Sequence, residues 1–264
     1  MLQYEFMQNA MMAGLIISIL CPMVGVFLVL KRYSMMGDTL SHASFAGIAL
    51  GFILGIDPLL SAFAFTTLCG LFIEVLRSYY KQYSELVMSI VLTLSIGIAI
   101  IIVSTGKTGA NINSILFGSI LTVSKKDLLY IAIISIISIF TLSLLYNKLI
   151  YSTFDEEGAK TAGINVSLIN YIFTLLVGAT ISVSLRITGV LVISSMIVVP
   201  VATALQLGKG FKWTLIYSMI FGFIDVFIGL IASYYINSAP GGTIAVTSVI
   251  TLLITIIIKK VFIR

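Results

Sequence analysis

Nine long apolar stretches follow one another along this chain of 264 residues. The residues are 59% hydrophobic and 9% charged, whereas average soluble domains carry about 25% charged residues. Such a chain lacks the polar residues needed to cover a water-exposed surface. Crossing a bilayer takes about 20 apolar residues per helix, so this length leaves little chain for a soluble domain. The sequence therefore predicts an all-α polytopic membrane protein that forms a single domain over residues 1–264.

The apolar stretches predict about nine transmembrane helices, with eight and ten as the bounds. Each is expected to be a helix, because an open sheet would leave backbone groups without hydrogen bonds in lipid. The predicted spans are residues 10–30, 38–56, 58–76, 86–104, 127–147, 167–186, 189–207, 214–236 and 240–258. Asp57 and Pro58 form a helix-start signal for the third span, with an N-cap acid followed by proline.

The segment 110–124 is apolar but short, and it contains Asn111, Asn113 and Gly118. We interpret it as a re-entrant or interfacial piece that is buried against the rest of the protein, since irregular backbone survives at membrane depth only where protein or a cavity surrounds it. The two cysteines, Cys21 and Cys69, lie inside apolar stretches and are expected to be packing residues.

Basic residues predict the orientation. With the N-terminus outside, eleven of the fifteen lysines and arginines fall on the cytoplasmic side and four fall outside: Lys107, Lys125, Lys126 and Arg186. The positive-inside rule therefore favours an external N-terminus and a cytoplasmic C-terminus. We therefore interpret the net charge of +5 as a signal of membrane orientation, and we expect no nucleic-acid partner.

Asp38 and His42 are the most informative polar residues, and His42 is the only histidine in the chain. Residues four apart share one face of a helix. A carboxylate with an imidazole suits zinc, manganese or iron, and Ser41 and Thr39 lie nearby as candidate partners of these ligands. The alternative is that Asp38 caps a helix at the cytoplasmic edge and His42 is a packing residue. We favour metal contact, because an aspartate at the centre of a span costs about 2.5–3.5 kcal/mol.

Two ligands are too few for a tight metal site. A two-fold dimer that brought two second spans together would supply two aspartates and two histidines, and two-fold dimers are the commonest oligomers. A weak shared site also suits transport, because a conducted ion must be released again. We therefore expect a homodimer in which each copy contributes Asp38 and His42.

Other residues of the apolar stretches are candidate pathway or structural residues. Asp225 lies inside the eighth span, where an acid is either functional or paired with a group of another span. Pro200 is expected to kink its helix, and Pro240 with Gly241 breaks the chain at the outer start of the last span. The small residues Ala43, Gly47, Gly51 and Gly55 of the second predicted span let another helix approach closely, either as ordinary packing within one subunit or along a pathway.

The longest cytoplasmic loop is predicted at residues 148–166. Its acidic residues Asp155, Glu156 and Glu157 precede Gly158 and Ala159 and stand where a helix N-terminus prefers negative charge. Gly163 can end that helix. A short helix on the inner face would be a docking site for a cytoplasmic partner, although a solvated loop without a partner remains the alternative.

Several enzyme signatures are absent. Gly106-Lys107-Thr108 ends like a phosphate-binding loop, but Ile101 stands where the motif needs glycine. The chain contains no His-Glu-x-x-His and no Gly-x-Ser-x-Gly. We therefore expect no catalytic residues and no ATPase motif of its own. An intramembrane enzyme that uses His42 is a weaker alternative.

Four sequence stretches resemble the permease subunit of the zinc/manganese/iron-type metal ABC importers. The first is Gly37-Asp38-Thr39-Leu40-Ser41-His42-Ala43. The others follow in the expected order along nearly the whole chain: 155–159, the run from Gly189 through Pro200 to Ala204, and 240–244. Family members often have proline where this chain has Glu156, which loosens the helix start but keeps its acid.

The resemblance implies a permease of the bacterial plasma membrane that works as a homodimer with two copies of a cytoplasmic ATP-binding subunit. An extracytoplasmic metal-binding protein would deliver manganese, zinc or iron, so that the metal is cargo and no cofactor is permanently bound. The resemblance places Asp38 and His42 on the metal pathway and assigns 155–159 to coupling with the ATPase. The alternative is a secondary metal transporter that works alone.

Overall fold

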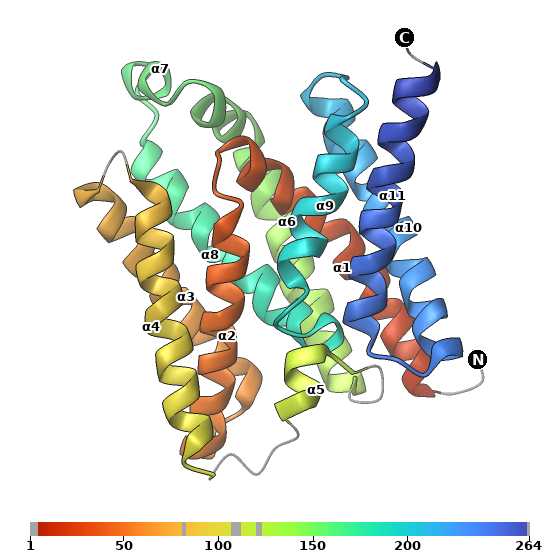
Figure 1. Ribbon diagram of the computed structural model, residues 1–264. Coiled ribbons are helices and arrows are strands. Elements are labelled where there is room, and N and C mark those ends of the chain that lie inside the picture. The colour runs from red at the N-terminus through yellow and green to blue at the C-terminus, as the bar shows by residue number, and fades with distance from the viewer. Residues whose placement is uncertain (1–4, 81–82, 107–111, 120–122, 263–264) are drawn as a thin grey trace.

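The computed structural model describes residues 5–80, 83–106, 112–119 and 123–262, and these are arranged as a bundle of helices without strands (Figure 1). The helices are α1 (Glu5–Leu30), α2 (Met35–Leu54), α3 (Pro58–Tyr79), α4 (Ser84–Ser104), α5 (Ile112–Phe117), α6 (Lys125–Phe154), α7 (Glu156–Thr161), α8 (Val166–Thr188), α9 (Ile193–Leu205), α10 (Phe211–Ile236) and α11 (Pro240–Phe262). The predicted all-α class is confirmed for this part of the chain.

Seven helices are long and apolar enough to cross a membrane, namely α1, α3, α4, α6, α8, α10 and α11. The sequence predicted two further spans, which correspond to α2 and α9. The first half of α2 carries Asp38 and His42, which lower its hydropathy, and α9 has only 13 residues. The structure therefore confirms a polytopic protein with seven candidate spans.

Burial separates the central helices from the peripheral ones. In α1 and α8, 67% and 72% of the most apolar window is buried, whereas the corresponding fraction is 22% for α6 and 17% for α11. Leucine, isoleucine and phenylalanine side chains cover the outer faces of the peripheral helices. This arrangement suits a bundle in lipid, where outward-facing apolar residues carry no desolvation cost.

The helix-start and packing signals of the sequence have clear counterparts. The Asp57 carboxylate accepts hydrogen bonds from the backbone N–H groups of Leu59 (2.8 Å) and Leu60 (3.1 Å). A side chain on Gly47 would lie 2.7 Å from the Cα atom of Ala62, so α2 and α3 touch almost backbone to backbone. Gly47 and Gly51 thus serve packing of α2 against α3 inside one subunit, whereas a side chain on Gly55 would meet nothing within 4 Å. Cys21 and Cys69 are both free and buried, as expected.

The predicted loop at 148–166 was too long. Helix α6 continues to Phe154, because no glycine or proline interrupts it before Asp155 ends it. Its 30 residues give a length of about 45 Å, against a hydrocarbon core of about 30 Å. The last turns of α6 therefore carry α7 beyond the ends of the neighbouring helices, as Figure 1 shows at the top of the bundle.

At the opposite end, α5 packs against the α8–α9 connection. The backbone N–H groups of Val190 and Leu191 donate to the carbonyl oxygens of Ile115 (3.1 Å) and Leu116 (3.3 Å). Six residues are too few to cross a bilayer, so the described part of 110–124 is a short helix held against protein. Residues 110, 111 and 120–122 lie outside the described residues.

Three glycines bring α5, the end of α8 and the start of α11 together at this end. A side chain on Gly118 would lie 2.2 Å from the Ile187 carbonyl oxygen, and one on Gly241 would lie 2.0 Å from the Thr188 carbonyl oxygen. Gly189 has a φ of +75° and its own close contact with the backbone of α5. We call Gly118, Gly189 and Gly241 the three-glycine contact.

Candidate functional site

Asp38 and His42 lie one turn apart near the start of α2, with the Asp38 Oδ1 atom 4.0 Å from the His42 Nε2 atom. This distance is too long for a hydrogen bond. Two ligand atoms that each lie about 2.1 Å from one tetrahedral metal ion are roughly 3.4 Å apart, so the two side chains would have to approach each other slightly to share an ion. A small rotation of either side chain would let both atoms bind one ion.

The pair lies on the face of α2 that the rest of the chain leaves partly open. The Asp38 side chain is 43% exposed and the His42 side chain is 20% exposed, whereas Thr39, Leu40, Ser41 and Ala43 are fully buried. Figure 1 places α2 between α4 and α9 at the front of the bundle. Both side chains are therefore partly accessible from outside the chain.

Asp38 is not the N-cap residue of α2, so the alternative that it caps a helix is wrong. Helix α2 begins at Met35 after the N-cap residue Ser34, so Asp38 lies within the helix. The predicted partners of the ligands are also engaged elsewhere. The Ser41 hydroxyl donates to the backbone carbonyl of Asp38 (2.8 Å), and the Thr39 hydroxyl donates to the carbonyl of Met35 (3.0 Å).

The Asp38–His42 pair has no third histidine, cysteine, aspartate or glutamate grouped with it in the described part of the chain. Among the described residues, no group of three or more histidine, cysteine, aspartate or glutamate side chains could hold a metal ion. The Asp38–His42 pair therefore supplies two candidate ligands on a partly exposed face of α2.

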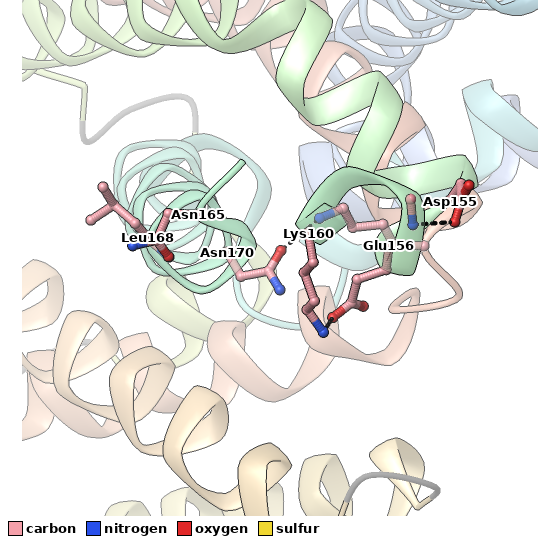
Figure 2. Close-up of polar contacts among 8 residues, drawn as sticks. Asp155, Glu156, Lys160, Asn165, Leu168 and Asn170 are labelled. Atoms are coloured by element: carbon pink, nitrogen blue, oxygen red, sulfur yellow. Dashed lines mark hydrogen bonds and ion pairs between the residues drawn. The ribbon is translucent and has the colours of Figure 1, made fainter. Parts of the chain in front are cut away.

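The acidic segment forms the short helix that the sequence predicted. The Asp155 carboxylate is the N-cap of α7 and accepts from the backbone N–H of Gly158 (2.8 Å), and Lys160 pairs with Glu156 (2.7 Å) (Figure 2). Ala159 is the buried residue of α7. Helix α7 ends at Thr161, and Gly163, which follows the C-cap residue Ala162, has a φ of +79°, the left-handed conformation that glycine favours.

A polar cluster behind α7 was missed from the sequence. Arg77 and Glu74 of α3 form an ion pair (2.8 Å), with side chains only 13% and 9% exposed. The Thr174 hydroxyl of α8 donates to Glu74 (3.0 Å), and the Arg77 guanidinium lies 4.0 Å from the centre of the Tyr33 ring. The signal available in the sequence was an acid and a base three residues apart at the end of an apolar stretch.

This cluster faces a cavity of about 610 Å³ that it shares with α7. The lining includes Glu74 and Arg77 on one side and Glu156, Glu157 and Lys160 on the other. The cavity therefore places the exposed acids of α7 opposite a buried ion pair of α3. Tyr33 also lines it and stands two residues before α2 begins.

Lys31, which directly follows α1, extends the cluster toward α8. Its Nζ atom donates to the Asn170 Oδ1 atom (2.7 Å). Burial, together with the positive charge of Arg77, lowers the pKa of Lys31 to about 8, against about 10.4 for an ordinary lysine. The ends of α1, α3 and α8 are thus joined by charged and polar groups beside α7.

The remaining candidates lie away from Asp38 and His42. Asp225 is 1% exposed and accepts a hydrogen bond from the Thr251 hydroxyl of α11 (2.7 Å). Pro200 lies inside α9 and lines a small space next to Asp225. Pro240 is the first residue of α11, and Gly241 belongs to the three-glycine contact. The structure places none of these four with the Asp38–His42 pair.

The similarity of this chain to known proteins covers nearly its whole length. Residues 3–259 match the model of the ABC 3 transport family. The chain is 48% identical to "Probable metal transport system membrane protein" of Treponema pallidum, over 99% of this chain and 98% of that protein. It is 33% identical to "Probable iron transport system membrane protein" of Haemophilus influenzae, over 100% and 97% of the two chains.

Among solved structures, the chain is similar to "PsaBC from Streptococcus pneumoniae in complex with Fab". The TM-score is 0.84 and the sequence identity is 29%, with 96% of this chain and 91% of that chain covered. The similarity therefore extends to the arrangement of the helices as well as to the sequence.

Proposed function

Because this chain belongs to the ABC 3 transport family, we propose that it is the transmembrane subunit of an ATP-driven bacterial importer for a divalent transition metal. The protein is a multi-pass protein of the plasma membrane. The observation that carries the proposal is the Asp38–His42 pair, a carboxylate and an imidazole on one partly open face of α2. Manganese, zinc and iron all accept such ligands, and iron is the metal named for the Haemophilus influenzae relative.

The metal site is proposed to be shared by two copies of the chain. Each copy offers two ligands on an open face, and a two-fold axis beside α2 would bring two such pairs together. Four ligands of this kind would complete a coordination shell that neither copy forms alone. Metal would bind at the interface of a homodimer and be released as the two copies change their relative arrangement.

The proposed topology has nine crossings, with α2 and α9 added to the seven apolar helices. Helix α1 begins at the end of the bundle opposite to the end of α11 (Figure 1), as an odd number of crossings requires. The basic residues favour an external N-terminus. Helix α7 then lies on the cytoplasmic side, and the three-glycine contact lies on the outer side, where a metal-binding protein would dock.

Two copies of a cytoplasmic ATP-binding subunit are proposed to act through α7. ATP hydrolysis is assigned to that partner. Glu156 and Glu157 are exposed on α7, whereas Ala159 is buried beneath it, so α7 can offer acids to a partner while it stays fixed to this chain. Binding and hydrolysis of ATP would move α7, and alternating access needs two such states that differ in metal affinity.

Replacing both Glu156 and Glu157 by lysine should weaken the association with the ATPase, because the docking acids would become repulsive to a partner that binds them. Co-purification of the ATPase with the tagged permease measures this. Glu85→Lys is the control, since Glu85 is also an exposed acid at the same end of the bundle. Unchanged co-purification of the double variant would contradict the docking role of α7.

The buried Glu74–Arg77 pair is proposed to connect α7 with α2 through Tyr33. Arg77→Met alone should fold poorly, because an unpaired buried carboxylate costs about 3–5 kcal/mol. Combining it with Glu74→Met removes both charges and should restore assembly, yet lower the amount of metal transported per ATP hydrolysed. Both quantities are measurable in vesicles that contain the complex. A double variant with a normal ratio would contradict the connection.

Reconstitution tests the function as a whole. Vesicles with the permease, the ATPase and the metal-binding protein should take up metal only when ATP is supplied on the ATPase side. Uptake by the permease alone, driven by an ion gradient, would favour the stand-alone secondary transporter instead. Parallel measurements with manganese, zinc and iron would identify the cargo.

A further inference from the structure

A narrow space lies inside each copy of the chain where α1, α9, α10 and α11 meet. Its lining includes Ser18 and Pro22 of α1, Met196 and Pro200 of α9, Asp225 of α10 and Ser248 of α11. No water-sized sphere fits in it. We call these six residues the proline junction. None of them belongs to the Asp38–His42 pair or to the polar cluster behind α7.

Both prolines leave a backbone carbonyl without its usual helical donor. Proline has no N–H, so Pro22 cannot donate to the Ser18 carbonyl and Pro200 cannot donate to the Met196 carbonyl. The Ser18 carbonyl faces α10, because a side chain on Gly222 would lie 2.7 Å from its oxygen atom. Two residues whose carbonyls lack a helical partner thus line the same space.

Asp225 brings a carboxyl group into this space with one oxygen atom unbonded. Its Oδ1 atom accepts the hydrogen bond from Thr251, whereas its Oδ2 atom is buried and accepts no hydrogen bond of ordinary length from the described residues. The Ser248 hydroxyl lies beside the carboxyl group, but it donates to the Ile244 carbonyl (2.9 Å). An ionised carboxylate in a buried space too small for water is strongly destabilised, and protonation removes this cost.

The charged residues of the four helices around Asp225 lie near the helix ends, several turns away from Asp225, and do not neutralise it. Helix α9 has no charged residue, and those of the other three helices lie near the helix ends: Glu5 in α1, Lys212 in α10, and Lys259 and Lys260 in α11. The nearest thiol along α1, that of Cys21, is engaged with the Ser184 hydroxyl of α8 (3.3 Å). Asp225 therefore has no counter-ion in the junction.

We propose that the proline junction is a proton-binding site, in which Asp225 carries a proton while the four helices are packed as they are here. The carboxylate takes up one proton on its Oδ2 atom, and the resulting O–H group can donate a hydrogen bond within the junction, where Ser18 and Met196 have carbonyls without helical donors. The exchange is a simple protonation, and the proton returns to water when the junction opens. This inference rests on the proposed function, because we take the opening of the proline junction to be part of alternating access.

The junction is also a place where the bundle can bend. Proline removes one helical hydrogen bond and is a common cause of helix kinks, and here two such positions touch the same helix. The contact is close, since a side chain on Gly222 would lie 2.6 Å from the Pro22 Cγ atom. A neutral Asp225 favours the closed junction, whereas an ionised Asp225 favours an open and hydrated one. Raising the pH should therefore promote opening.

Infrared spectroscopy of the purified permease–ATPase complex tests the protonation directly. The wild type should show the C=O stretching band of a buried carboxylic acid, and Asp225→Asn should lose that band. Thr251→Val should shift the band without removing it, because the hydrogen bond to Oδ1 is lost. A wild type without the band, a band that survives in Asp225→Asn, or a band that Thr251→Val leaves unmoved would each overturn the assignment.

Hydrogen exchange tests the link to opening. After correction for the intrinsic pH dependence of exchange, the α10 segment around Asp225 should exchange faster as the pH rises in the wild type, and this dependence should be lost in Asp225→Asn. Identical pH profiles, or exchange that responds to Na⁺ and not to pH, would overturn the proposal. Neither measurement requires metal transport, so both remain decisive if the proposed cargo is wrong.

Discussion

Replacing Asp38 or His42 by alanine is expected to abolish metal uptake while the complex still assembles and hydrolyses ATP. Each copy contributes two ligands to the proposed shared site, so one substitution removes half of the protein ligands in a homodimer. Uptake of manganese, zinc or iron into vesicles, compared with ATP hydrolysis by the same preparation, measures both effects. The two side chains are partly exposed, so folding should be little affected.

Ser41→Ala is the matched control for these variants. Ser41 lies between the two proposed ligands, but its side chain is buried and its hydroxyl donates to the backbone of Asp38. This variant removes an oxygen atom from the same turn without touching the open face of α2, and uptake should persist. Normal uptake by Asp38→Ala or His42→Ala would refute the metal role of the pair. Equal losses in all three variants would indicate damage to α2 instead.

The features that the sequence predicted well are those set by local spacing. Composition alone required helices, because no other structure satisfies the backbone in lipid. Four-residue spacing placed Asp38 and His42 on one face of α2, and the acids at 155–157 preceded a helix because carboxylates satisfy its free N–H groups. Each of these inferences needs only the geometry of a single helix.

The features that the sequence did not predict depend on contacts between distant residues. Pro22 and Pro200 both border the Asp225 junction although they are 178 residues apart in the chain. Glu74 meets Thr174 across 100 residues. Spacing within a helix says which residues share a face, but it does not say which other helix that face meets. The end of α6 was missed for a different reason. The apolar content of the chain decreases after residue 147, whereas the helix continues to Phe154.

Gly241→Ala is expected to disrupt the outer end of the protein, whereas Gly242→Ala should be tolerated. The added methyl group on Gly241 would lie 2.0 Å from the Thr188 carbonyl oxygen and 3.0 Å from that of Phe117, and backbone atoms cannot rotate away. The start of α11 would have to move from α8 and α5, at a cost of about 1–3 kcal/mol or more. At Gly242 a methyl group would meet nothing within 4 Å.

Thermal stability in detergent and the yield of folded protein measure this difference. Both variants add one methyl group to adjacent positions of the same helix turn and reduce the flexibility of the unfolded chain alike, so the comparison isolates the three-glycine contact. A lower Tm for Gly241→Ala alone would support that contact. If the two variants had equal Tm values, α11 would not pack against the α8 terminus as described. Because the metal-binding protein is proposed to dock at this end, Gly241→Ala should also reduce its binding, even in the fraction of protein that remains folded.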